Sequence, residues 1–282
     1  MCKLYCILEI ENLVKAEKLA RKAIPFITRQ DGDGLGVMWL GDGAIHSKKW
    51  VTPPRSIDAP QGVAIKSKFA GALKIEYSEK GTRPATVDAI ALHARKATCG
   101  INIENTHPFQ TAKTALIHNG IIHNTTPADN KLSTCDSEKL LWQYLNHGVR
   151  EHPEHLTEAL ADVMGYYACM VFNTNGVIDI FVDGSATLFM GNVLGVGTVI
   201  ATSKENLSGS VKKAGFKLAW LYPVKAFSHI RWDRARVEIR TFEKPSATGP
   251  ALVKRAYGQV ENWQNDFHFE DQIDRIKSIK SV

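Results

Sequence analysis

Apolar residues recur along this chain in two spacings, one typical of helices and one typical of strands. A helix is predicted over Leu13 to Ile27, where apolar positions fall three or four residues apart. A first strand is predicted over Lys3 to Glu9, directly after Cys2. Further strands are predicted at short aliphatic and β-branched runs, namely Val37 to Leu40, Asp88 to Leu92, Thr114 to Ile117, Tyr166 to Phe172, Val177 to Val182, Thr187 to Met190, Thr198 to Thr202, Lys217 to Leu221, Ala226 to Trp232 and Val237 to Phe242.

Two more helices are predicted between the blocks of strands. One runs from Asp136 to Leu145, after the polar run Ser133 to Glu138, and the other runs from Leu156 to Val163. Residues from about Trp50 to Glu79 are predicted to form surface segments with one covering helix around Ala64 to Leu73. Strands in two blocks with helices between and around them predict an α+β fold.

Composition narrows the class of protein. Of the 282 residues, 44% are hydrophobic and 23% are charged, which is typical of a soluble globular protein. No apolar run approaches the roughly 18–20 residues that span a bilayer, and the N-terminus has no signal pattern, so a cytoplasmic location is expected. The five cysteines are scattered without metal-ligand spacing, so we expect reduced thiols, no metal ion and no cofactor. The net charge of +6 permits an acidic partner, but it is spread along the chain and is weak support for nucleic-acid binding.

Three clusters of polar residues lie between positions 92 and 124, and each follows or continues a predicted strand. We expect them where strands end and turns begin, because rigid scaffolds usually present chemistry there. Taken singly, each has an ordinary structural explanation. His93 would be a core histidine, Arg95 an ion-paired or solvated arginine, and Asn119-Gly120 a hairpin turn.

Taken together and in order, the clusters His-x-Arg-x-Ala-Thr-x-Gly, Asn-x-His-Pro-Phe and His-Asn-Gly-Ile-Ile-x-Asn resemble the glutaminase domain of class II glutamine amidotransferases. This family includes glucosamine-6-phosphate synthase and glutamine phosphoribosylpyrophosphate amidotransferase. Its members have a nucleophilic cysteine at the mature N-terminus, and this chain begins Met1-Cys2. The resemblance implies the four-layer αββα sandwich of the N-terminal nucleophile hydrolases, in which helices lie outside two antiparallel sheets.

The resemblance extends over residues 1–242. Residues 243–250 have a linker composition, and we expect the tail up to residue 282 to pack back on the domain or to contact a partner. The chain has no room for the additional isomerase or transferase domains of the larger family members.

The resemblance implies a role for each matching residue in catalysis. Cys2 would be the nucleophile after removal of Met1, and its freed α-amine, with a reference pKa of about 7.7–8.0, would take the thiol proton. The side-chain amide of Asn119 and the backbone N–H of Gly120 would stabilise the oxyanion. A retained Met1 would block the amine.

The resemblance also implies how free glutamine is recognised. Arg95 would bind the substrate carboxylate, with Thr98 nearby, because a guanidinium can form two parallel hydrogen bonds. Asp136 would pair with the substrate ammonium, and it could also cap the helix that follows. His107 would shape the glutamine pocket.

Several positions depart from the family pattern or carry structural roles. Lys96 replaces a tryptophan and Cys99 replaces a histidine, so we expect coupling to an acceptor to differ from that of the synthase. The glycine-rich run Asp31 to Gly36 is predicted to be a turn before a strand, and its last four residues fit the family's Asp-x-x-Gly turn. His93 and His118 are expected to be structural.

The sequence therefore predicts a glutaminase subunit that hydrolyses L-glutamine to L-glutamate and ammonia and passes the ammonia to a separate synthetase or transferase. Two alternatives remain open: an N-terminal-cysteine hydrolase of another γ-glutamyl amide, and a catalytically silent relative that binds or regulates a partner. Nucleic-acid binding rests on net charge alone. The oligomeric state is left open, with a homo-oligomer included.

Overall fold

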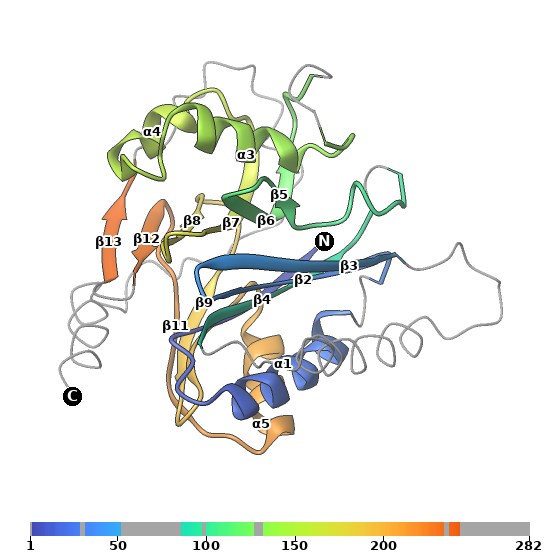
Figure 1. Cartoon of the computed structure of the whole chain (residues 1–282), viewed down its shortest axis with the longest axis vertical. Coiled ribbons are helices and arrows are strands. Elements are labelled where there is room, and N and C mark those ends of the chain that lie inside the picture. Colours follow the sequence, from blue (N-terminus) through green and yellow to red (C-terminus); the bar gives the residue numbers. More distant parts are fainter. Residues whose placement is uncertain are drawn as a thin grey trace.

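The chain folds as two antiparallel β-sheets stacked face to face, with helices on both outer faces (Figure 1). The computed structural model describes residues 2–28, 32–51, 86–97, 100–126, 132–233 and 237–242. This arrangement confirms the predicted four-layer αββα sandwich. None of the helices in these ranges is long and apolar enough to cross a membrane.

The first sheet has seven strands in the order β11-β9-β10-β1-β4-β2-β3. Their bounds are β1 (Lys3–Leu8), β2 (Gly34–Gly41), β3 (Ala44–Val51), β4 (Val87–Arg95), β9 (Phe189–Val193), β10 (Gly197–Ala201) and β11 (Leu218–Pro223). Helices α1 (Leu13–Ile27) and α5 (Lys204–Ala214) cover its outer face. Strand β1 lies in the middle and pairs with β10 on one side and β4 on the other, so the N-terminus is held within the sheet.

The second sheet has six strands in the order β13-β12-β8-β7-β6-β5. Their bounds are β5 (Phe109–Gln110), β6 (Thr114–Ile122), β7 (Gly165–Asn173), β8 (Ile178–Val182), β12 (Ser228–Trp232) and β13 (Val237–Thr241). Helices α3 (Ser137–Asn146) and α4 (Leu156–Ala159) cover this sheet, and the short 3-10 turn η2 (Pro153–His155) leads into α4.

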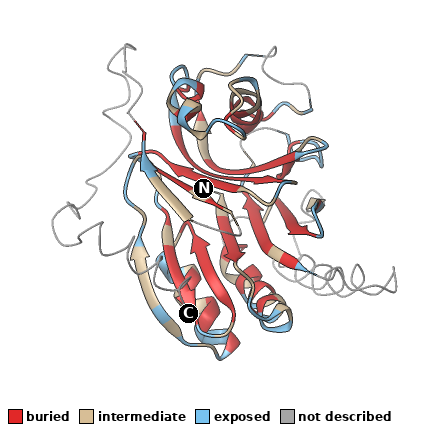
Figure 2. Ribbon diagram, turned by 60° about the vertical axis from the view of Figure 1, so that its left-hand side comes forward, coloured by how far each residue is buried: buried red, intermediate tan, exposed pale blue. Residues whose placement is uncertain are grey.

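Alternation along the strands distributes side chains among three apolar layers. In β1, Tyr5 and Ile7 pack toward α1 and α5, whereas Leu4 and Cys6 pack between the sheets. In β6, Leu116 belongs to the layer beneath α3, and its neighbours along the strand face the other sheet. Most strand residues are consequently buried (Figure 2), as expected for sheets covered on both faces.

Most predicted elements are confirmed, and the differences have local causes. Strand β3, the two-residue strand β5 and helix α5 were not predicted, and the helix predicted over Leu156 to Val163 ends at Ala159. The helix predicted around Ala64 to Leu73 and the tail at 243–282 lie outside the described residues. The domain boundary at residue 242 therefore stays a prediction.

The strands that carry the polar clusters are longer than predicted. Strand β4 continues through His93 to Arg95, and β6 continues through Asn119 and Gly120 to Ile122. His93, His118, Asn119 and Gly120 thus lie within strands, because pairing with neighbouring strands satisfies the backbone there. Arg95 ends β4 as expected, and the second cluster lies in the loop that leads into β5. The hairpin turn, which is the ordinary interpretation of Asn119-Gly120 taken without the other clusters, is wrong.

Candidate active site

Pairing of β1 with β4 determines the position of Cys2. Lys3 lies opposite Ala94 in the register of the two strands, so Cys2 comes beside the end of β4. The Cys2 Sγ accepts a hydrogen bond from the backbone N–H of Lys96 at 3.3 Å and lies 3.6 Å from the carbonyl oxygen of the same residue. The half-buried thiol is thus held by main chain, and this contact does not depend on the lysine side chain that replaces the family's tryptophan.

Arg95 ends β4, and its side chain is only 2% exposed. Side chains alternate along the strand, so that of Arg95 points to the same face as Ala91 and His93, toward the second sheet. The turn that follows is held by Asp33, whose N–H donates to the Arg95 carbonyl at 3.1 Å and whose Oδ2 accepts from the Ala97 N–H at 2.8 Å. These two bonds fix the backbone on both sides of the point where β4 ends.

The glycines after Asp33 serve a close approach and do not form the predicted turn. Gly34 and Gly36 are strand residues of β2. A Cβ on Gly36 would lie 1.8 Å from the carbonyl oxygen of His107, and one on Gly34 would lie 3.0 Å from Oγ1 of Thr106. The loop that contains the Asn-x-His-Pro motif therefore crosses β2 where no side chain stands in its way.

Asn119 and Gly120 lie on opposite faces of β6. Side chains alternate along a strand, so that of Asn119 points to the same face as Ala115 and Ile117, into the space between the sheets. Asn119 is 3% exposed, and its Oδ1 has no hydrogen-bond partner among the described residues. Gly120 has φ +154°, and a Cβ there would lie 1.9 Å from the carbonyl oxygen of Tyr166. Only glycine fits this position, as an oxyanion-binding backbone N–H would require.

Asp136 lies at the N-terminus of α3, but its side chain makes no capping hydrogen bond. Its Oδ2 instead accepts a hydrogen bond from the backbone N–H of Ile122 at 2.7 Å. Its Oδ1 lies 3.3 Å from the Cys135 thiol and 3.5 Å from the Ser137 hydroxyl. The capping role that we allowed for Asp136 is therefore wrong, and the carboxylate is tied to the end of the strand that carries Asn119.

The second motif is joined to the segment before α3 through Asn105. The Asn105 Oδ1 accepts from the Thr134 N–H at 2.8 Å, and its Nδ2 donates to the Gly100 carbonyl at 3.1 Å. This side chain, 1% exposed, links the three chain segments around the candidate site. The sequence motif contained Asn105, but no role was predicted for it.

Three buried imidazoles lie behind these groups. His93 Nε2 donates to the carbonyl oxygen of His118 at 2.9 Å, because a carbonyl can only accept, and this bond joins β4 of one sheet to β6 of the other. The ring of His107 lies with its centroid 4.0 Å from that of His93 and 4.7 Å from that of Phe109. His118 Nδ1 lies 2.7 Å from the hydroxyl of Ser137.

Burial keeps these rings uncharged. It lowers the pKa of His93 to about 3, lowers the pKa of His107 well below its ordinary value, and lowers the pKa of His118 against the opposing effect of Asp136. Both nitrogens of His107 are buried without hydrogen-bond partners among the described residues. His107 therefore packs its ring at a tilt against His93 and edge-on against Phe109, and its predicted effect on the glutamine pocket would be through these rings.

Thr98, Cys99 and Met1 lie outside the described residues. The structure thus brings Cys2 next to the end of β4, joins that strand to β6 through the His93–His118 bond, and ties Asp136 to β6. Within the described ranges, no group of His, Cys, Asp or Glu side chains is arranged to hold a metal ion.

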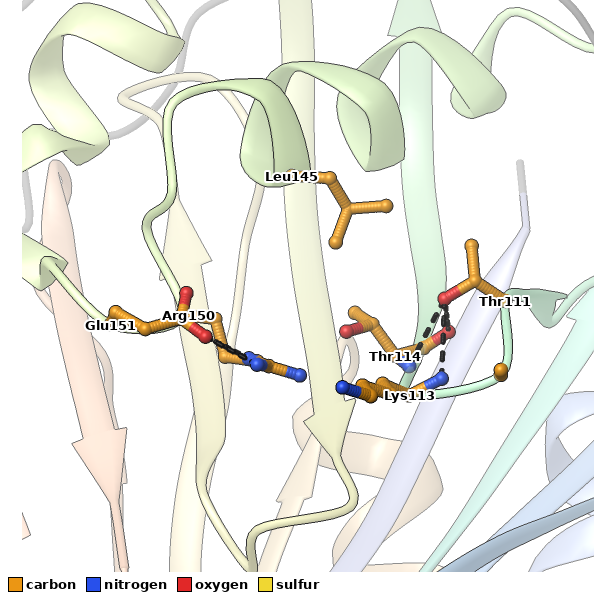
Figure 3. A pocket seen from close by; sticks show the side chains of 7 residues that line it. Thr111, Lys113, Thr114, Leu145, Arg150 and Glu151 are labelled. Atoms are coloured by element: carbon orange, nitrogen blue, oxygen red, sulfur yellow. Dashed lines mark hydrogen bonds and ion pairs between the residues drawn. The ribbon is translucent and has the colours of Figure 1, made fainter.

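A surface hollow of about 410 Å³ lies away from these residues, where β6 begins and α3 ends (Figure 3). Its lining includes Thr111, Lys113, Leu145 and Arg150, and the Arg150 guanidinium is ion-paired with Glu151. The hollow contains none of the residues predicted for glutamine chemistry. We place the candidate site at Cys2 on the strength of the strand pairing and hydrogen bonds described above.

The four-layer sandwich has the fold of solved glutamine amidotransferase structures. One match is glutamine phosphoribosylpyrophosphate amidotransferase from B. subtilis complexed with ADP and GMP, with 16% identity, a TM-score of 0.60, and coverage of 86% of this chain and 49% of that chain. Another is described as the allosteric regulatory enzyme of purine biosynthesis, with 16% identity, a TM-score of 0.59 and the same coverage of each chain.

A glutamine aminotransferase class-II domain protein from Silicibacter pomeroyi also matches, with 13% identity, a TM-score of 0.49, and coverage of 86% of this chain and 100% of that chain. No protein-family model and no curated protein matches the sequence. At 16% identity the first two likenesses establish the fold, and this chain spans about half the length of those two structures.

Proposed function

We propose that this chain is a glutaminase of the class II amidotransferase type, which hydrolyses L-glutamine to L-glutamate and ammonia through a thioester on Cys2. The observation that carries the proposal is the strand arrangement. Pairing of β1 with β4 places the Cys2 thiol beside the strand that ends in Arg95, and the bond from His93 to the His118 carbonyl joins that strand to the one carrying Asn119 and Gly120.

The reaction would proceed in two acyl-transfer steps. With Met1 removed, the α-amine of Cys2 takes the thiol proton, and the thiolate attacks the side-chain amide carbon of glutamine. Negative charge develops on the amide oxygen, where the Asn119 amide and the Gly120 N–H donate hydrogen bonds. The C–N bond then breaks, the leaving nitrogen takes the proton from the α-ammonium, and ammonia departs from a thioester.

Water completes the cycle. The α-amine accepts a proton from water as the oxygen attacks the thioester carbon, and the C–S bond breaks to release glutamate and the thiol. Arg95 binds the α-carboxylate and Asp136 the α-ammonium, so both charged ends of free glutamine have a partner of opposite sign. We further propose that the ammonia passes to a separate acceptor enzyme, because hydrolysis alone would waste glutamine.

Intact-mass analysis with the glutamine analogue 6-diazo-5-oxo-norleucine tests this proposal. The wild-type protein should have lost the mass of Met1 and should gain one adduct on Cys2. Cys2→Ala should gain none, whereas Cys6→Ala should still be alkylated, because burial raises the pKa of the Cys6 thiol and keeps it unreactive. Retained Met1 with no adduct would overturn the proposal in favour of a silent, partner-binding subunit.

Arg95→Lys tests the contact with the substrate carboxylate. A lysine keeps the charge but loses the paired donors that fit a carboxylate, so KM for glutamine should rise while the reactivity of Cys2 toward iodoacetamide stays unchanged. Unchanged KM would remove Arg95 from substrate recognition.

A further inference from the structure

The environment of His118 connects the three parts of the candidate site. Its side chain points to the same face of β6 as that of Leu116, toward the helix layer and away from the side chain of Asn119. It is 1% exposed. His118 therefore cannot touch a substrate that the Asn119 amide reaches from the other side of the strand.

One edge of the ring is bonded to the start of α3. His118 Nδ1 lies 2.7 Å from the hydroxyl of Ser137, which is the first residue of that helix and is 2% exposed. Ser137 follows Asp136 directly, and the Asp136 carboxylate accepts from the N–H of Ile122. The N-terminus of α3 is thus attached to β6 at two places, once on each side of Gly120 in the sequence.

The other edge of the ring lies against Gly120. A Cβ on Gly120 would lie 2.5 Å from His118 Nε2, so the imidazole fills the space beside this glycine. The backbone of residue 118 is held as well, since its carbonyl accepts from His93 Nε2 at 2.9 Å, two residues before Arg95. A displacement of this ring would consequently move the Asn119–Gly120 peptide relative to both Arg95 and Asp136.

We infer that His118 is a positioning residue, which through its bond to Ser137 sets the spacing between the oxyanion-binding peptide at Gly120 and the carboxylate of Asp136. This role rests on the proposed glutaminase function, because it gives the two groups a common substrate. The ring is buried on the face of β6 away from the Asn119 side chain, so it acts through geometry and takes no proton from the reaction. Misplacement of a reacting group by about 1 Å can cost on the order of 10²-fold in rate.

Two substitutions break the bond from opposite ends. Ser137→Ala removes the hydroxyl and leaves the imidazole, whereas His118→Phe keeps a ring beside Gly120 and removes the nitrogen. Each should lower the rate constant for alkylation of Cys2 by 6-diazo-5-oxo-norleucine by about 10- to 100-fold. The double variant should cost no more than the more impaired single variant, because both substitutions remove the same bond.

Ser210→Ala is the matched control. The Ser210 hydroxyl makes a buried bond of the same length, 2.7 Å, with the hydroxyl of Tyr5 in the layer under α5. Its loss should lower stability and leave the alkylation rate constant of the folded protein unchanged. A purely structural role for Ser137 would give the same result, with a reduced fraction of reactive protein and a wild-type rate constant.

The outcomes separate this inference from the proposed function. If the wild type is not alkylated at Cys2, the glutaminase proposal fails and this role falls with it. If the wild type is alkylated and Ser137→Ala reacts at the same rate constant, the positioning role alone is overturned. The backbone amide resonance of Gly120 gives a readout without chemistry, since it should shift in Ser137→Ala and stay in place in Ser210→Ala.

Discussion

Acidification from pH 7.5 to 5.5 should destabilise this protein strongly, because His93, His107 and His118 are buried and uncharged. Burial lowers the pKa of each ring below the value of about 6.5 that an exposed imidazole has. Above that value the rings are neutral in both states and pH has no effect on stability through them. Below it the unfolded chain binds protons that the folded protein does not, so the free energy of unfolding decreases as the pH falls.

The size of the effect follows from linkage. At pH 5.5, one unit below the unfolded value, an imidazole that stays neutral in the folded protein costs about 1.4 kcal/mol, so His93 and His107 together cost about 3 kcal/mol relative to pH 7.5, and His118 acts in the same direction. For His93 the loss continues down to its folded pKa of about 3. A loss of this size is a large part of the roughly 5–15 kcal/mol of a typical domain.

Urea denaturation at pH 7.5, 6.5 and 5.5, followed by circular dichroism at constant ionic strength, measures the loss. His107→Phe isolates one ring, since both of its nitrogens lack hydrogen-bond partners among the described residues and a phenyl ring can keep the tilted contact with His93 and the edge-on contact with Phe109. The decrease between pH 7.5 and 5.5 should be smaller in this variant by about 1.4 kcal/mol.

The reasoning would be refuted if His107→Phe and the wild type lost the same free energy over this pH range. That result would mean that position 107 binds its proton equally in the folded and unfolded states. The ring would then have to be accessible to water, and its packing between His93 and Phe109 would be wrong.

Two further predictions concern the scaffold. Gly36→Ala places a methyl group 1.8 Å from the His107 carbonyl oxygen, so it should lower the free energy of unfolding by about 1–3 kcal/mol or more and slow alkylation of Cys2. Gly32→Ala, where the nearest atom lies 3.8 Å away, should do neither. Equal melting temperatures for the two variants would contradict the close approach. Tyr144→Phe removes the hydroxyl that donates to Asp179 Oδ2 at 2.5 Å, so it should lower the free energy of unfolding by about 1–3 kcal/mol and leave the alkylation rate constant unchanged. An unchanged urea midpoint would count against that bond.

Periodicity was a good guide to elements with one clear apolar face. Helix α1 has the predicted bounds, because its six buried positions repeat at helical spacing and Asn12 caps its first turn. Helix α5 was missed because it is polar and contains Gly209. The structure explains that glycine: a Cβ there would lie 2.5 Å from the ring of Phe26, so the two helices can approach only if the position has no side chain. The N-cap Ser203 and the C-cap Gly215 were signals that could have identified α5.

The candidate site residues were predicted from their combination, but their local structure was not predicted. The local sequence does not show that β4 and β6 continue through polar residues. The backbone hydrogen bonds there are made with strands that lie far away in the sequence. Cys2 and Lys96 illustrate the point, because a contact across 94 positions follows from strand pairing and has no local signature. The four-layer sandwich was likewise implied by the family resemblance, and periodicity alone predicts only an α+β fold.

Glycine shows most clearly why secondary structure cannot be predicted from the local sequence alone. A glycine is selected wherever a Cβ cannot be accommodated, and this happens both in turns with positive φ and in extended strands crossed closely by another segment. Gly36 belongs to the second kind, and so the sequence around it reads as a turn although it forms a strand. Gly120 combines both demands, with φ +154° and the carbonyl of Tyr166 only 1.9 Å from a Cβ. At both positions the segment that excludes a side chain belongs to the candidate site or to its supporting strand, so the reason for the glycine lies in a neighbour distant along the chain and is not visible in the local sequence.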